Sequence, residues 1–206
     1  MKKILGCMIG CFLIVILFIS LGMSNKNSKE LFNTPSVYHS TGEEVSIGNN
    51  FFDSVSENPD GYTVQICDAT VKSIEEYMSE IGVSETSIPL FDEFGYPRTK
   101  YVYDVKIKIS NDNNTDGFVL ISRYMLIDKA LVLDMDLELF ELRYPDLAGT
   151  YAVTLSPHSE YELVLPFTAS PGDRLRYENE INSRMLEDKF VLCISEYPIR
   201  QLLHVN

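Results

Sequence analysis

The residues whose spacing best suits chemistry lie in one polar stretch between two predicted strands. Asp112, Asn114 and Asp116 alternate and Gly117 follows, as in the opening of a calcium-binding loop, D-x-[DN]-x-[DN]-G. Oxygen donors at alternate positions suit a hard cation, and the glycine permits a tight turn. The position for a bidentate glutamate holds Arg123, and strands rather than helices are expected on both flanks. An Asn/Asp-rich hairpin turn is the favoured interpretation, and the metal site is the weaker alternative.

Paired carboxylates could perform the acid–base chemistry of a glycoside hydrolase. The sequence holds 30 acidic side chains, however, and a chain this acidic produces such pairs by chance. The sets are Glu43–Glu44, Glu75–Glu76, and Asp134 with Asp136. The three histidines, His39, His158 and His204, are scattered, and the motifs of zinc proteases, serine hydrolases and nucleotide-binding loops are missing from the sequence. We expect no catalytic residue and no cofactor.

The four cysteines divide into two pairs. Cys7 and Cys11 fall in an apolar N-terminal run, whereas Cys67 and Cys193 fall in predicted strands. A bond between the strand-borne pair would resemble the inter-sheet disulfide of immunoglobulin domains. Two buried free thiols are equally ordinary, since cysteine packs as a small hydrophobic residue. Both alternatives stay open at this stage.

The N-terminal run from Ile4 to Met23 is uncharged and follows Lys2 and Lys3. Its 20 residues would span roughly 30 Å as a helix, the thickness of a bilayer core. A cleaved signal peptide begins alike, but this run is longer than a usual signal core and ends without an A-x-A pattern. We therefore favour a retained transmembrane anchor over residues 1–23, with a signal segment as the alternative.

Charge separates the two parts of the chain. The formal charge is −13, and the two lysines before the apolar run leave 15 basic against 30 acidic side chains after it, a charge of −15. No basic cluster is available for phosphate neutralisation, so we expect no nucleic-acid partner. We expect a polar linker over residues 24–41 and one domain over residues 42–206, held outside the cytoplasm by a single-pass anchor in the cell membrane.

Within the domain the hydrophobic period is mostly two. The clearest strand is Tyr101 to Ile109, in which Ile107 faces the core and Lys108 faces solvent. Seven or eight strands separated by turns predict a mainly β fold, an antiparallel immunoglobulin-like sandwich. The other predicted strands are 45–47, 62–71, 118–126, 137–142, 151–155, 161–167 and 190–195.

Two short helices interrupt this pattern. The first is 73–81, where Ser73 stands three residues before Glu76 in a capping box, and Ile74, Tyr77, Met78 and Ile81 share one face. The second is 178–187. Residues 82–98 between strands are expected to form a long loop.

A family resemblance rests on three segments: Leu155-Ser-Pro157, Tyr161-Glu-Leu-Val-Leu-Pro-Phe167 and Phe190-Val-Leu-Cys-Ile-Ser-Glu-Tyr-Pro198. They resemble membrane- or lipid-anchored extracytoplasmic proteins of Gram-positive bacteria, grouped as domains of unknown function with an immunoglobulin-like sandwich. The likeness covers most of residues 43–206, although His158 stands where the family usually has glycine. It implies a location and a fold, and it carries no catalytic residue.

These observations favour a membrane-tethered, non-catalytic interaction or sensing module whose partner is another cell-surface protein. A cell-wall or carbohydrate-binding module is the first alternative, because 12 tyrosines could supply a sugar platform. Against it, Tyr101 and Tyr103 share the period-two face of Val105 and are more simply core residues. A hydrolase using paired carboxylates is the second and least favoured alternative.

Overall fold

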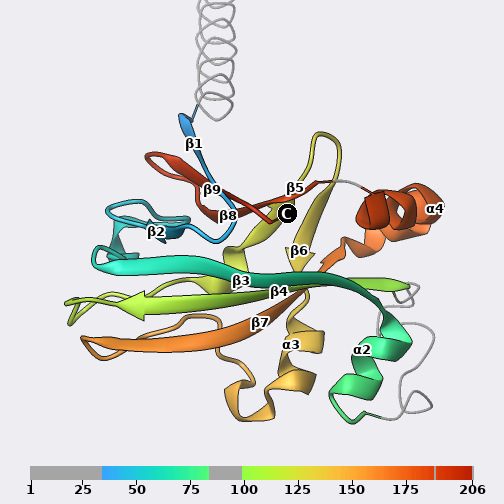
Figure 1. The fold of residues 1–206 in the computed structure, drawn as a ribbon, viewed down its shortest axis with the longest axis horizontal. Coiled ribbons are helices and arrows are strands. Elements are labelled where there is room, and N and C mark those ends of the chain that lie inside the picture. The colour runs from blue at the N-terminus through green and yellow to red at the C-terminus, as the bar shows by residue number, and fades with distance from the viewer. Residues whose placement is uncertain (1–33, 84–98, 188, 206) are drawn as a thin grey trace, which may run out of the picture. The chain divides into compact units, whose positions relative to one another are not determined.

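The computed structural model describes residues 34–83, 99–187 and 189–205. Its main elements are nine strands and three helices (Figure 1). The strands are β1 Ser36–His39, β2 Glu44–Ser46, β3 Tyr62–Ser73, β4 Tyr101–Asn111, β5 Met125–Ile127, β6 Val132–Met135, β7 Ser159–Ala169, β8 Val191–Ser195 and β9 Arg200–His204. The helices are α2 Ile74–Glu80, α3 Leu137–Arg143 and α4 Pro171–Glu187, and the 3-10 turns are η1 Val55–Glu57, η3 Ile121–Arg123 and η4 Pro145–Leu147.

Hydrogen bonds join all nine strands into one sheet, in the order β1-β9-β8-β5-β6-β7-β4-β3-β2. Every pairing is antiparallel except that of β1 with β9. The sheet curls so that β8 and β9 form one layer and β3, β4 and β7 another (Figure 1). The mainly β fold is thus confirmed. The two-sheet immunoglobulin-like sandwich is not confirmed, because a single curled sheet provides both layers.

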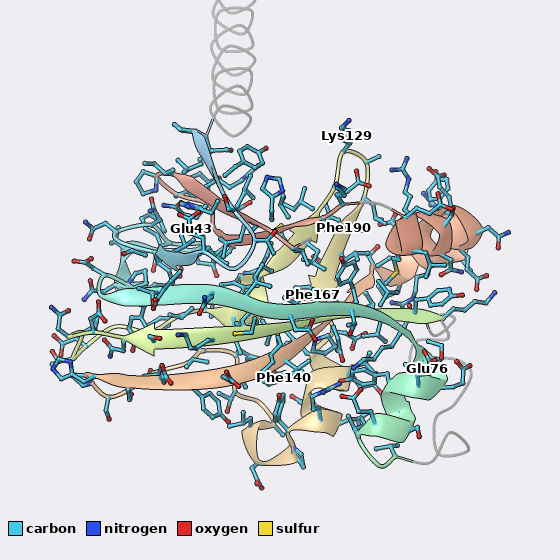
Figure 2. The ribbon with its side chains drawn as sticks, in the orientation of Figure 1. Glu43, Glu76, Lys129, Phe140, Phe167 and Phe190 are labelled. Carbon is cyan, nitrogen blue, oxygen red and sulfur yellow. The ribbon has the colours of Figure 1, made fainter. Side chains whose placement is uncertain are left out.

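The core fills the space inside this curl. Ile107 and its neighbours on the inner face of β4 are fully buried, as the alternating pattern predicted, and Lys108 lies on the other face. Figure 2 shows Phe167 of β7 and Phe190, just before β8, between the two layers. The alternation of buried and exposed side chains fails at one end of β4, where Val102 lies on the outer face and is nevertheless buried. There α2 and α3 cover the outer face of the sheet, and Val102 packs with Tyr77, Met78 and Leu139.

The predicted α2 helix is confirmed together with its capping box. The Ser73 hydroxyl accepts from the Glu76 amide, and the Glu76 carboxylate accepts from the Ser73 amide. The second predicted helix is confirmed but begins earlier, at Pro171, and α4 changes direction at Tyr177, whose backbone is not helical.

Other predicted elements differ from the structure. Residues 137–142 are helix α3 rather than a strand, because the Asp136 carboxylate caps the Leu139 amide at 3.1 Å. The predicted strands 118–126 and 151–155 shorten to a single bridge between Val119 and Val153, followed by η3 and β5. Strands β6 and β9 were not predicted.

The linker prediction is wrong over Ser36–His39, because these residues form β1 and pair with residues 200–203 of β9. The domain therefore begins at Ser36 rather than at residue 42. The predicted anchor over residues 1–23 lies outside the described residues. Among those described, no helix is both long enough and apolar enough to cross a membrane.

Candidate functional site

The polar turn after β4 is organised around Asn114. Its Nδ2 donates to the carbonyls of Asn58 at 2.7 Å and Asp60 at 2.6 Å, and its Oδ1 accepts from the amides of Asp116 at 2.9 Å and Gly117 at 2.5 Å. The oxygen proposed as a calcium ligand is therefore occupied by two backbone donors. The geometry gives Asn114 a structural role, fastening this turn to the loop before β3.

Gly117 is required by the same turn. A Cβ at this position would come within 1.8 Å of the Asn58 carbonyl oxygen, which no side chain tolerates. Asp112 and Asp116 lie exposed on the surface of the turn. Among the described residues, no group of three or more His, Cys, Asp or Glu side chains is arranged to hold a metal ion.

The cysteines of the predicted disulfide are free thiols in the structure. Cys67 falls at a bulge of β3, where the pairing with β4 skips from Ile66 to Asp68, and its side chain is exposed. Cys193 is fully buried in β8, and burial raises the pKa of its thiol to about 12. Cys67 follows the buried Ile66 and is exposed on the outer face of β3, away from the core that holds Cys193, so the structure does not form the disulfide that the sequence left open.

Asp136 and Glu76, two of the carboxylates considered for hydrolysis, have structural roles. Asp136 caps α3 and also accepts from the Thr168 hydroxyl at 2.9 Å, and Glu76 caps α2. Asp134 is exposed on β6, and partial desolvation of its carboxyl group, with a smaller contribution from Asp173, raises the pKa of that group. The histidines also lie apart: His39 contacts Gln201 and Glu43, His204 stacks on Tyr38, and His158 forms the turn before β7.

An ion cluster around one buried carboxylate joins α2 and α3 to the outer face of the sheet. Asp104 of β4 is 3% exposed, and its Oδ2 accepts from Arg143 at 2.8 Å and from Lys72 at 3.0 Å. Glu80 completes the cluster by pairing with both cations. The Arg143 guanidinium also lies 4.7 Å from the centre of the Tyr77 ring. Two cations and two carboxylates compensate one another, so the cluster fixes the helices in place.

Electrostatics in this cluster follow from burial. Burial raises the pKa of Asp104, although the charge of Arg143 and the hydrogen bond from Lys72 act in the opposite direction. Burial also raises the pKa of Tyr77, whose hydroxyl donates to the Leu139 carbonyl at 2.9 Å. The period-two pattern of β4 puts Asp104 on the same face as Lys108, the face expected to lie in solvent. The signal that could have corrected this expectation was the apolar face of the predicted helix 73–81, which needed a surface to cover.

The surface has a groove between α4 and the β5–β6 hairpin, whose tip is Lys129 (Figure 2). It has a volume of about 380 Å³. Tyr177, at the bend of α4, is 54% exposed beside it. Other lining residues are Leu131, Val132, Asp173, Glu180, Ile181 and Arg184. An exposed aromatic ring between carboxylates can stack on, and hydrogen-bond to, a sugar ring.

A second, more apolar groove of about 240 Å³ lies beside the first half of β7. One wall is Tyr161 and Leu163 of β7, and the other is the segment 150–155. Phe140 and Leu147 line it as well, and Ile121 completes the lining. Tyr161 and the neighbouring Tyr151 remain 41% and 45% exposed, so the apolar surface here is accessible from solvent.

The edge of β7 next to this groove is open. β4 runs along one side of β7 from Ser159 to Phe167, but β6 covers the other side only from Phe167 to Ala169. Tyr144 covers one further position, accepting from the Val164 amide at 2.9 Å. No described residue forms a backbone hydrogen bond with the remaining edge at Glu160 and Glu162. The sequence predicted the strand, but the open side depends on where β6 ends.

These observations define a mainly β domain, built on one curled and mostly antiparallel sheet, with two surface grooves and an open strand edge. Residues 36–201 match the family model described as domain of unknown function DUF5028, and the chain belongs to that family. The family match confirms the resemblance to a domain of unknown function. No curated protein matches the chain, and no solved structure does.

Proposed function

We propose that this protein is a non-catalytic interaction module that binds another protein through the groove and open edge beside β7. The observation that carries the proposal is the coincidence of accessible apolar side chains with a sheet edge that, among the described residues, has no neighbouring strand over residues 159–163. Folded proteins normally protect such edges with charge, bulges or a covering element, because an open edge pairs with other chains. Here the charges of Glu160 and Glu162 oppose pairing with a second copy, but no described segment covers their backbone groups. An edge left open beside an apolar groove suits recognition of a partner.

The location is part of the same proposal. The apolar run from Ile4 to Met23 would tether the domain to the cell membrane, and the charge of −15 after it favours a domain that stays away from anionic lipid. The resemblance to anchored extracytoplasmic proteins of Gram-positive bacteria supports a position outside the cytoplasm. The partner would then be another cell-surface protein.

Photo-crosslinking from the groove tests the proposal. A photoreactive residue replaces Tyr161 in the full chain, in the cell that naturally produces it, and a matched variant carries it at Val55, which is 78% exposed on η1. We expect a discrete protein adduct from position 161 and none from position 55. Equal adducts from both positions, or none from position 161, would contradict a binding role for the groove.

A carbohydrate-binding function is the second candidate, and Tyr177 favours it. Its exposed ring lies in the α4 groove with Asp173 and Glu180, the combination that sugar recognition uses. Sedimentation with purified cell wall tests this alternative. Loss of sedimentation in Tyr177→Ala, with no loss in Tyr161→Ala, would assign the function to the α4 groove instead.

A further inference from the structure

We propose that the partner enters as an extended peptide strand that pairs with β7 and alternates apolar with basic side chains. This inference rests on the proposed function and specifies the chemistry of the ligand. It combines three features of the described residues: the direction of the free backbone groups on β7, the apolar groove on one side of the edge and the charged ladder on the other.

The free backbone groups follow from the alternation of an antiparallel strand, in which every second residue directs both its N–H and C=O to the same side. On the side away from β4, the Pro166 carbonyl accepts from the Asp136 amide at 2.8 Å, and the Val164 amide donates to Tyr144. Glu160 and Glu162 lie two and four positions before Val164, so they alternate in step with it. Their N–H and C=O groups therefore face the open side, where an incoming strand would find two donors and two acceptors.

The groove supplies apolar contacts for alternate residues of that strand. Tyr161 and Leu163 alternate with the two glutamates along β7. Their side chains point to the inner side of the sheet, where they line the 240 Å³ groove. Ala152 and Thr154 line the facing wall, and their backbone groups form no hydrogen bond with another described residue. Side chains of an added strand that point inward would thus enter an apolar space of limited size, which suits residues such as valine.

The opposite face of the edge selects for positive charge. Glu162 pairs with Lys106 of β4 at 2.7 Å, and Glu160 lies 3.9 Å from Lys108. A strand added beyond β7 would place its outward side chains next to these two glutamates, on the side opposite the lysines. Opposite charges on neighbouring strands are stabilising and like charges are destabilising. Lysine or arginine at the outward positions would continue the alternation of charge across the sheet.

The same charges disfavour a second copy of this chain as the occupant. Two β7 edges paired about a twofold axis would bring the glutamates of one copy against those of the other. The free edge is also short, so the interface is small and the complex belongs to the weak, transient class.

Binding of synthetic peptides to the full chain in nanodiscs of zwitterionic lipid tests the inference, with empty nanodiscs as the blank. The probe is a seven-residue peptide of alternating lysine and valine, blocked at both ends. A peptide with glutamate in place of lysine, and one with the lysines and valines in separate blocks, are the controls. We expect saturable binding of the alternating lysine peptide, and at least about tenfold weaker binding of both controls.

N-methylation of the peptide separates strand pairing from mere adhesion of a cationic chain. One version is methylated on the lysine amides and the other on the valine amides. In an antiparallel pair the residues opposite Glu160 and Glu162 direct their amides to β7, so methylated lysines should abolish binding while methylated valines should not. The reverse pattern would indicate a parallel strand. Equal effects of the two methylations would overturn the inference.

Protein variants locate the site. Glu162→Gln removes one charge, and Glu162→Pro removes the charge and the edge N–H while keeping a backbone that this strand already accepts at Pro166. We expect peptide binding to weaken by about threefold in the first variant and by more than about tenfold in the second. Unfolding curves of both variants verify that the fold persists, and the methylated peptides provide the test on the unmodified chain if it does not.

The outcomes also separate this inference from the proposed function. If position 161 crosslinks a cellular protein while the alternating peptide does not bind, the interaction module stands and strand addition is wrong. If neither occurs, both proposals fail. Slow hydrogen exchange at Glu160 and Glu162 before any peptide is added, together with absence of peptide binding, would show that another segment of this chain covers the edge and would also overturn the inference.

Discussion

The backbone amide of Val164 donates a hydrogen bond to the hydroxyl of Tyr144 at 2.9 Å. A side chain from the turn after α3 thereby occupies a position on β7 that a neighbouring strand would otherwise fill. The Tyr144 ring is held in place by Phe140, with ring centres 5.0 Å apart. This contact marks the point where the open edge of β7 ends.

Removing that hydroxyl tests how much the contact stabilises the domain. Tyr144→Phe keeps the ring and leaves the Val164 amide without its acceptor, so we expect the free energy of unfolding to fall by about 1 kcal/mol in urea titrations. Tyr161→Phe is the matched control, because no hydrogen bond of the Tyr161 hydroxyl is present among the described residues, and it should change stability little. Equal losses in the two variants would contradict the role given to Tyr144.

The register of β4 makes opposite predictions for two adjacent residues. Ile107 is fully buried in the core, whereas the Lys108 side chain is 24% exposed on the outer face. Ile107→Asp should destabilise the domain by about 3 kcal/mol or more through a buried unpaired charge, and Lys108→Asp by less than about 1 kcal/mol. Thermal melts of the two variants check this, and equal melting temperatures would refute the assigned register.

Asn114 should prove structural and independent of calcium. Asn114→Ala removes four hydrogen bonds, two within the turn and two that join the turn to the loop before β3, and we expect a loss of about 2–4 kcal/mol in unfolding free energy. Calcium added to the unmodified protein should leave the melting temperature unchanged. A calcium-dependent rise that disappears in Asp112→Asn would restore the metal site.

Arg143 should matter far more than an exposed arginine. Arg143→Ala leaves the buried Asp104 carboxylate with one cation fewer, and we expect a loss of about 3 kcal/mol or more. The control is Arg123→Ala, since Arg123 and its partner Asp53 are 58% and 54% exposed, and such pairs contribute about 0–1 kcal/mol. Similar denaturation midpoints for both variants would show that the cluster does not hold α2 and α3.

The two cysteines of the domain should differ in reactivity. With Cys7 and Cys11 replaced by serine, a maleimide should label the native protein once, at the exposed Cys67. Burial raises the pKa of Cys193 to about 12, so its thiol should react only after denaturation. Mass spectrometry of Cys67→Ser and Cys193→Ser identifies the labelled site. Loss of native labelling in Cys193→Ser would contradict this assignment.

Much of the strand content was predictable because period-two burial is a local property. It located β3, β4, β7 and β8 in outline, and the capping box located α2. Local pattern was insufficient for residues 137–142, where the sequence Leu-Glu-Leu-Phe-Glu-Leu fits a strand as well as a helix and the Asp136 cap decides. The curl of one sheet, the burial of Asp104 and the open half of β7 depend on contacts between segments far apart in the sequence.

The parallel pairing of β1 with β9 has a mechanical consequence. Any pull that reaches the domain from its N-terminal side is transmitted through β1, which forms one end of the sheet and is joined to it through β9. Its four residue pairs, Ser36 to His39 with Arg200 to Leu203, would carry that load in shear. Tension would therefore detach β1 first and uncover the edge of β9, while the longer β3–β4–β7 ladder remains intact.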